Sequence, residues 1–99
     1  MNVIWSDLAV QDLEDIEEYI ARDNPDRAIS FIMELVDLGD SLGLEGQEMK
    51  GTPAKWIQNP NVRELYYHEY TIIYEVREND VIIHEVHNFR KLSRYMGLR

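Results

Sequence analysis

The sequence contains no cysteine, which excludes a disulfide framework and a thiolate metal site. It is also poor in basic residues, since 10 Lys and Arg face 19 Asp and Glu and the formal net charge is −9. Phosphate backbones bind to cationic surfaces, so this balance weighs against nucleic acid as the primary ligand. No apolar run approaches the length of a membrane span, and the N-terminus lacks the pattern of a signal peptide. These absences favour a soluble protein of the cytoplasm.

The chain of 99 residues has room for a single domain, residues 1–99, with one modest core. Its charges are unevenly distributed, because residues 1–21 contain no Lys or Arg whereas the last ten residues contain no acid. The bases of that last segment are Arg90, Lys91, Arg94 and Arg99. A basic tail on an acidic body is expected to fold back onto the chain's own helices or to contact a partner.

The N-terminal half has the pattern of one strand and two helices. Residues 2–5 form a short apolar run, and Ser6 can cap the helix that follows. Apolar residues then recur at spacings of four, three and four, which predicts an amphipathic helix that ends before Asn24-Pro25. A second amphipathic helix starts at this Asn-Pro pair and ends near Gly43, so the two helices form an αα-hairpin.

The C-terminal half has the pattern of a sheet. A long connection over residues 44–61 precedes three strand-like runs at 62–67, 70–77 and 81–87, whose links are short enough for antiparallel hairpins. The run 70–77 alternates between an apolar and a mixed face. The order β-α-α-β-β-β predicts an α+β fold, with the αα-hairpin packed on one face of an antiparallel sheet, a basic tail, and the opposite face open.

Four stretches, taken together in this order and spacing, resemble the ParE/RelE family of bacterial type II toxins. They are Trp5-Ser6 through Asp12-Leu13 with Ile16 and Tyr19-Ile20, Asn24-Pro25 with Ala28, Val62-Arg63-Glu64-Leu65, and Tyr70 through Tyr74. The string Val86-His87-Asn88-Phe89-Arg90 is similar to the family's closing strand. The resemblance implies a growth-inhibiting toxin that is neutralised by a cognate antitoxin in a hetero-oligomeric complex.

The family has two modes of action, and the residues favour the one that does not cut nucleic acid. RelE-like toxins cleave mRNA on the ribosome with cations on the open sheet face, and the resemblance puts Val62, Glu64 and Thr71 where that branch carries two lysines and an arginine. ParE-like toxins inhibit DNA gyrase by protein contact, and we expect this mode here. The alternatives are a metal-independent, ribosome-dependent endoribonuclease that uses Arg90, Lys91 and Tyr95, and a non-toxic module that only binds the antitoxin.

Few residues in the sequence are candidates for catalysis or metal binding. His87 is a candidate general acid or base, although a lone histidine at a strand end is more often a hydrogen-bonded surface residue. His68 and His84 are isolated as well, so the sequence predicts no metal site and no cofactor.

The remaining candidates concern contacts rather than chemistry. Arg63 alternates in step with Leu65 toward the helices, where we expect it to have a structural role by pairing with Asp12 or Asp15. Trp56 and Ile57, in the long connection, are expected either to cover the edge of the core or to contact the antitoxin. With Glu64 and Thr71 they are the candidate antitoxin-binding residues. The tyrosines of the strands, Tyr66, Tyr67, Tyr70 and Tyr74, are expected to pack within the sheet rather than to stack on RNA bases.

Overall fold

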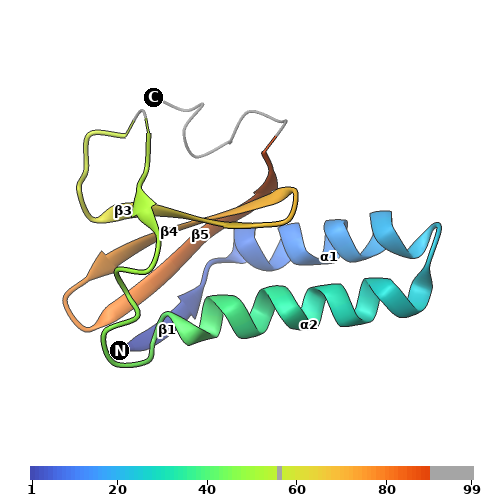
Figure 1. Ribbon diagram of the computed structural model, residues 1–99, viewed down its shortest axis with the longest axis horizontal. Coiled ribbons are helices and arrows are strands. Elements are labelled where there is room, and N and C mark those ends of the chain that lie inside the picture. The colour runs from blue at the N-terminus through green and yellow to red at the C-terminus, as the bar shows by residue number, and fades with distance from the viewer. Residues whose placement is uncertain (56, 90–99) are drawn as a thin grey trace.

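The computed structural model describes residues 1–55 and 57–89. The elements are β1 (Asn2–Trp5), α1 (Asp7–Ala21), α2 (Pro25–Ser41), β2 (Thr52–Pro53), β3 (Val62–Tyr67), β4 (Tyr70–Arg77) and β5 (Asp80–Asn88). The strands form a sheet with the order β1-β5-β4-β3-β2. The two helices run side by side on one side of this sheet, as Figure 1 shows. The α+β architecture expected from the sequence is therefore confirmed.

Both helices begin where their capping residues predict. The Ser6 hydroxyl accepts a 3.0 Å hydrogen bond from the backbone N–H of Ala9, and the Asn24 side-chain oxygen accepts one of 3.0 Å from that of Arg27. Pro25 occupies the first turn of α2, where its missing N–H costs nothing. These caps satisfy backbone donors that a helix start leaves unpaired.

The sheet is mixed rather than antiparallel throughout. Strands β3, β4 and β5 form the two expected hairpins, with turns at His68-Glu69 and Glu78-Asn79. Strand β1, however, pairs with β5 in the parallel direction, and β2 pairs with β3 at the far edge. The partners in β1 and β5 are 78 positions apart, and β2 lies in a connection without a period. Hydrophobic alternation carries no information about such neighbours.

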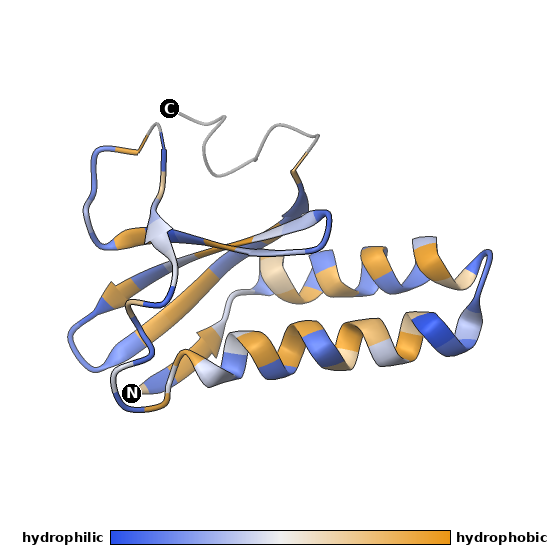
Figure 2. Ribbon diagram, viewed as in Figure 1, coloured by the Kyte–Doolittle hydropathy of each residue, from blue (hydrophilic) through white to orange (hydrophobic). Residues whose placement is uncertain are grey.

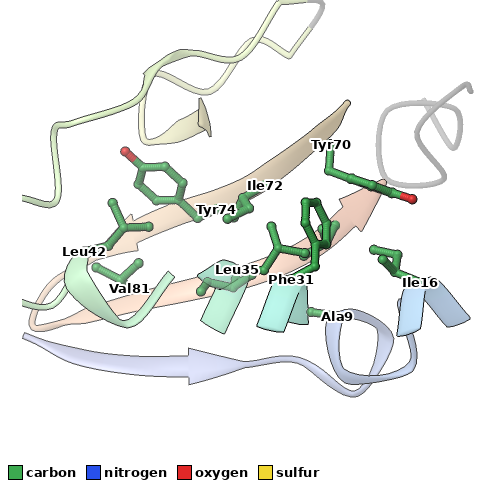
Figure 3. Packing of buried hydrophobic residues seen from close by; sticks show 11 residues of the cluster. Ala9, Ile16, Phe31, Leu35, Leu42, Tyr70, Ile72, Tyr74 and Val81 are labelled. Carbon is green, nitrogen blue, oxygen red and sulfur yellow. The ribbon is translucent and has the colours of Figure 1, made fainter. Parts of the chain in front are cut away.

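The main core lies between the αα-hairpin and the sheet. Apolar stripes follow both helices in Figure 2, and Figure 3 shows Phe31 and Leu35 of α2 beside Ile72 of β4. The buried cluster comprises Ala9, Ile16, Phe31, Leu35, Leu42, Tyr70, Ile72, Tyr74, Val81, Ile83 and Val86. Removing this much apolar surface from water is what keeps the helices on the sheet.

The opposite face of the sheet is not open, which corrects the expectation from the sequence. Ala54 and Val62 pack against Ile73 in a second buried cluster, and Ile57 packs against the same group. The segment that follows β2 therefore covers the middle of this face. On the helix side of the sheet, the buried Tyr74 holds the part of the connection that precedes β2: its hydroxyl accepts a 2.9 Å hydrogen bond from the N–H of Gly51 and donates to the carbonyl of Glu48 at 2.9 Å.

Candidate functional site

The candidate site is the sheet face that points away from the helices, which we term the second sheet face. It is formed by three cross-strand rows, because residues that pair across neighbouring strands point to the same side. The rows are His87, Thr71 and Tyr66; Glu85, Ile73 and Glu64; and Ile82, Glu75 and Val62. The pairing shifts by one residue between Ile73 and Tyr74, opposite His84. Irregularities of this kind redirect side chains, and the His84 ring is brought to the Glu75 carboxylate.

Acidic side chains are buried on this face. Glu64 is 4 % exposed, Glu75 is 6 % exposed and Glu85 is 1 % exposed. Burying an ionised carboxylate is costly unless hydrogen bonds or cations compensate for the lost water. Glu64 accepts hydrogen bonds from the Lys55 N–H at 3.2 Å and from the Tyr66 hydroxyl. The second sheet face is consequently built around carboxylates and their donors.

Glu75 lies at the centre of a compact ionic group. Its carboxylate is 2.8 Å from Nε of Arg77 and 2.8 Å from Nε2 of His84. Burial by itself would raise the pKa of Glu75, but the hydrogen bonds from Arg77 and His84 outweigh it, so this pKa lies below its usual value. Tyr66 responds in the opposite sense. The hydrogen bond to Glu64, together with partial burial, raises the pKa of Tyr66 to about 12.

Val62, Glu64 and Thr71, which stand where the RelE branch carries cations, all lie on the second sheet face. Val62 and Thr71 are buried, with exposed fractions of 0 % and 3 %, and Glu64 lies on β3 two residues beyond Val62. Thr71 pairs with Tyr66 on one side and His87 on the other. His87 presents a buried Nδ1 that has no hydrogen-bond partner among the described residues. The other candidates, Arg90, Lys91, Tyr95 and Trp56, lie outside the described residues.

Two expectations about contacts can be compared with the geometry. Ile57 packs against the second buried cluster, as a residue that covers the edge of the core does. Arg63 was expected to pair with Asp12 or Asp15, and this is wrong. Its guanidinium donates to the carbonyl of Gly51 at 2.6 and 3.1 Å, because the connection between α2 and β3 reaches it before the helices do. Asp12 instead accepts a 2.9 Å hydrogen bond from the N–H of Val86.

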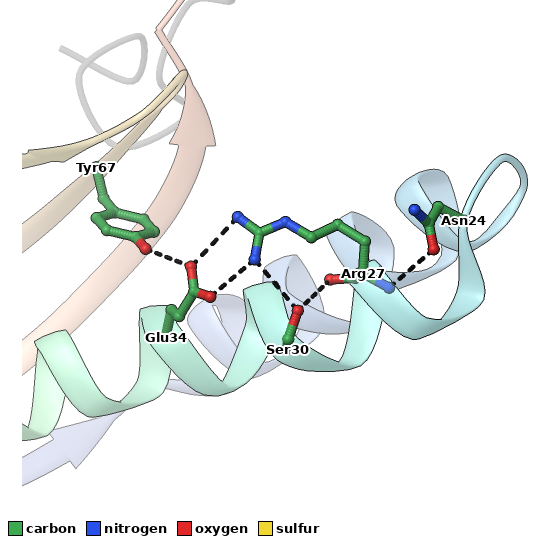
Figure 4. A network of polar contacts seen from close by, with 5 residues as sticks. All are labelled: Asn24, Arg27, Ser30, Glu34 and Tyr67. Atoms are coloured by element: carbon green, nitrogen blue, oxygen red, sulfur yellow. Dashed lines mark hydrogen bonds and ion pairs between the residues drawn. The ribbon is translucent and has the colours of Figure 1, made fainter.

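A polar network on α2, which the sequence reasoning missed, ties this helix to β3. Figure 4 shows that the Glu34 carboxylate receives the Arg27 guanidinium on one side and the Tyr67 hydroxyl on the other. The Arg27 to Glu34 contact is 2.7 Å. The hydrogen bond from Arg27, followed by that from Tyr67, lowers the pKa of Glu34. In the sequence, the seven-residue spacing of Arg27 and Glu34 is the one sign of this ion pair, and it does not indicate that Tyr67 joins it.

We also considered metal-binding sites and membrane-spanning helices. Among residues 1–55 and 57–89, no three His, Asp or Glu side chains are grouped so that they could hold a metal ion. Neither helix of these ranges combines the length and the apolarity that crossing a membrane requires.

The fold, two helices packed on one side of a five-stranded mixed sheet, is a small α+β domain of the kind found in toxin–antitoxin systems. Residues 3–90 match the family described as ParE toxin of type II toxin-antitoxin system, parDE. The chain therefore belongs to the ParE toxin family and is a type II toxin.

Two solved structures have the same fold. One is the chromosomal ParDE toxin–antitoxin system from P. aeruginosa, with a TM-score of 0.77, 20 % identity, and coverage of 89 % of this chain and 95 % of that chain. The other is the toxin–antitoxin complex RelBE2 from Mycobacterium tuberculosis, with a TM-score of 0.63, 15 % identity, and coverage of 91 % and 92 %. A search of curated proteins by sequence gave no match.

Proposed function

We propose that this ParE-family toxin inhibits growth by binding a protein target, DNA gyrase, and that a cognate antitoxin neutralises it. The observation that carries the proposal is the row of Glu85, Ile73 and Glu64 across the second sheet face. The middle of this face is apolar and both of its flanks are carboxylates. These buried side chains are not themselves a contact surface, but they place carboxylates where RNA cleavage needs cations, which favours a protein target over RNA.

The argument against RNA cleavage is electrostatic. Cleavage by the ribose 2′-OH needs cations that stabilise the extra charge on the phosphorus centre. The described part of the second sheet face has Glu64, Glu75 and Glu85 instead, and Arg77 of this region is already 2.8 Å from Glu75. Two like charges about 4 Å apart cost ~1 to 4 kcal/mol at aqueous to surface dielectrics, so Glu64 disfavours a phosphate at its own position.

The test is a supercoiling assay with purified gyrase and the purified toxin. We expect loss of supercoiling with rising toxin concentration, and recovery when the cognate antitoxin is added first. When the toxin is added to ribosomes that are translating an mRNA, we expect the mRNA to remain uncut. Unchanged supercoiling at toxin concentrations that stop cell growth would remove the gyrase target.

The second candidate is the RelE-like endoribonuclease, which rests on the buried Nδ1 of His87 on the same face. An imidazole there, three residues before Arg90 in the sequence, provides a general acid or base for RNA cleavage, with Arg90, Lys91 and Tyr95 as its candidate partners. It predicts ribosome-dependent cuts that disappear in Arg90→Ala and His87→Ala, whereas Arg22→Ala, which removes a cation on α1, leaves them unchanged. If no cuts occur in the unmodified toxin, this candidate is excluded.

The antitoxin is proposed from the family and from the two solved relatives, whose titles name toxin–antitoxin systems. Because the toxin carries a charge of −9, we expect the toxin-binding segment of the antitoxin to be rich in Lys and Arg. An adjacent short reading frame with an acidic segment in that place contradicts this. Trp56 and Ile57 remain candidate contacts, whereas the buried Glu64 and Thr71 offer a partner little surface.

The third candidate is a non-toxic module that only binds the antitoxin. Expression of the protein in cells without the antitoxin distinguishes it from the two toxic candidates. Arrest of growth excludes the third candidate, and normal growth excludes the first two.

A further inference from the structure

A cleft of about 580 Å³ lies between α1 and the C-terminal half of β5. Strand β1 ends at Trp5, opposite Ile83, so within the described residues helix α1 takes over as the neighbour of β5 from there on. Asp12 bridges this junction through its hydrogen bond to the N–H of Val86. The cleft is lined by Asp12, Asp15, Ile16, Glu18, Tyr19, Arg22, Tyr70, Glu85, Val86, His87 and Asn88.

The lining of this cleft combines carboxylates with apolar side chains. Three of its carboxylates, Asp12, Asp15 and Glu18, come from consecutive turns of α1, and Glu85 comes from β5. Among the described lining residues a single guanidinium, that of the exposed Arg22, accompanies them, and it is 3.7 Å from the Glu18 carboxylate. The apolar part of the lining consists of Ile16, Tyr19, Tyr70 and Val86. The occupant that such a surface selects is a peptide with alternating cations and apolar side chains.

The chain itself contains a segment of this composition. Residues 90–99 have four basic residues and no acidic one, and Leu92, Tyr95, Met96 and Leu98 are interspersed among them. The segment begins two residues after Asn88, which lines the cleft. The N–H of Phe89 donates a 2.8 Å hydrogen bond to the carbonyl of Glu69, so the chain is anchored to the turn between β3 and β4 directly before the segment starts.

The segment is long enough to reach along the whole cleft. Ten extended residues reach about 33 Å, whereas the ten residue steps from Asp12 to Arg22, at the end of α1, span about 15 Å. A segment tethered at the mouth of a cleft has an effective concentration in the millimolar range, well above the concentration of a free protein partner in a cell. We propose that the cleft between α1 and β5 is the docking site of the chain's own basic segment, residues 90–99. A cationic partner segment that uses this cleft has to displace it.

The experiment uses the absence of cysteine, which allows a single nitroxide spin label to be placed on the full chain. The label is attached at Gly97→Cys, and the intensities of the backbone amide signals are measured by NMR with the label oxidised and reduced. We expect loss of intensity for amides of α1 near Asp15 and Tyr19, and none near Leu44, which lies at the other end of the helical hairpin. The loss should decrease at high salt, because screening shortens the reach of exposed charges.

A matched pair of charge variants separates docking into this cleft from general attraction to an acidic protein. The double variant Asp15→Lys and Glu18→Lys is expected to abolish the loss of intensity on α1. The double variant Glu14→Lys and Glu17→Lys changes the net charge equally on the same helix, but away from the cleft lining, and should preserve it. All four side chains are exposed, so neither variant disturbs the core.

The proposal is overturned if α1 keeps its intensity, or if the two double variants behave alike. It is also overturned if the loss on α1 appears equally when a labelled chain without isotope is mixed with an isotope-enriched chain without label. That outcome means that the segment docks onto a second copy. None of these results depends on toxicity, gyrase or the antitoxin, so the test is independent of the proposed function.

Discussion

The Asp12 carboxylate on α1 accepts a 2.9 Å hydrogen bond from the backbone N–H of Val86 on β5. This contact crosses 74 positions of the sequence and joins the first helix to the last strand. Its physical origin is the shortness of β1, which ends opposite Ile83. A buried N–H without an acceptor is costly, and a carboxylate from the helix satisfies it where a strand no longer does.

Removing this carboxylate should destabilise the fold. We expect Asp12→Ala to lower the free energy of unfolding by about 1 to 3 kcal/mol, the cost of a buried polar group that loses its partner. Asp12→Asn, which keeps an acceptor oxygen, should lose less. Urea denaturation provides the free energies, and hydrogen exchange at Val86 reports the freed N–H. Glu14→Ala on the exposed side of the same helix is the control, and equal losses for Glu14→Ala and Asp12→Ala contradict the account.

The Tyr74 hydroxyl should be essential for holding the connection between α2 and β3. Tyr74→Phe removes the acceptor of the Gly51 N–H and the donor to the Glu48 carbonyl, both at 2.9 Å, with little change in volume. We expect a loss of about 1 to 3 kcal/mol in thermal or urea unfolding. Tyr19→Phe, at a residue that is 65 % exposed, should change stability little. A Tyr74→Phe protein as stable as Tyr19→Phe would show that this contact does not hold the connection.

Gly39 should tolerate no side chain, although it lies inside a helix. A Cβ at this position would be 2.4 Å from Cζ2 of Trp5 and 2.9 Å from Cδ1 of Ile83. Gly→Ala inside a helix normally stabilises by ~1 kcal/mol, but here we expect Gly39→Ala to destabilise by about 1 to 3 kcal/mol because Trp5 has to move. Denaturation and the near-ultraviolet circular dichroism of Trp5 report both effects. Asp37→Ala, at an exposed position of the same helix, controls for helix propensity, and a stabilised Gly39→Ala is the opposite of what the packing predicts.

The Glu75 group should make stability depend on pH in the acidic range. The pKa of Glu75 is depressed in the folded state, so its contribution is complete above the unfolded value, near 4.5, and is lost as the pH falls through the folded value. We expect Glu75→Gln to cost about 1 to 3 kcal/mol at pH 7 and progressively less toward pH 3. Urea denaturation across this range gives the difference. Glu78→Gln in the exposed turn should show no such trend, and a cost of Glu75→Gln that is constant with pH contradicts the prediction.

Much of the local structure could be predicted because its causes are local. Ser6 and Asn24-Pro25 mark the helix starts through capping, and the alternation from Tyr70 to Val76 predicts a strand with a packed face. The same reasoning assigned the tyrosines to packing, and Tyr70 and Tyr74 are indeed in the core. Tyr66 differs, since it is 54 % exposed and bonded to Glu64.

The candidate site was less accessible to sequence reasoning. The family resemblance placed Val62, Glu64 and Thr71 on one face, but it could not show that Ala54 and Ile57 return to cover the middle of that face. The partner of Arg63 was missed for the same reason, since Gly51 reaches it through a connection that has no period. A contact between distant segments depends on how loops pack, and no pattern within a strand records it.

The sequence by itself determined the two helices, the three C-terminal strands, the acidic body with its basic end, and the resemblance to the ParE/RelE toxins. These follow from capping, periodicity and composition, each of which acts within a few residues or over the whole chain. Only the tertiary structure decided that β1 runs parallel to β5, that Asp12 satisfies Val86, and that the second sheet face is built around buried carboxylates. Those features depend on which distant groups become neighbours when the apolar surface is buried, and that is a property of the packed chain.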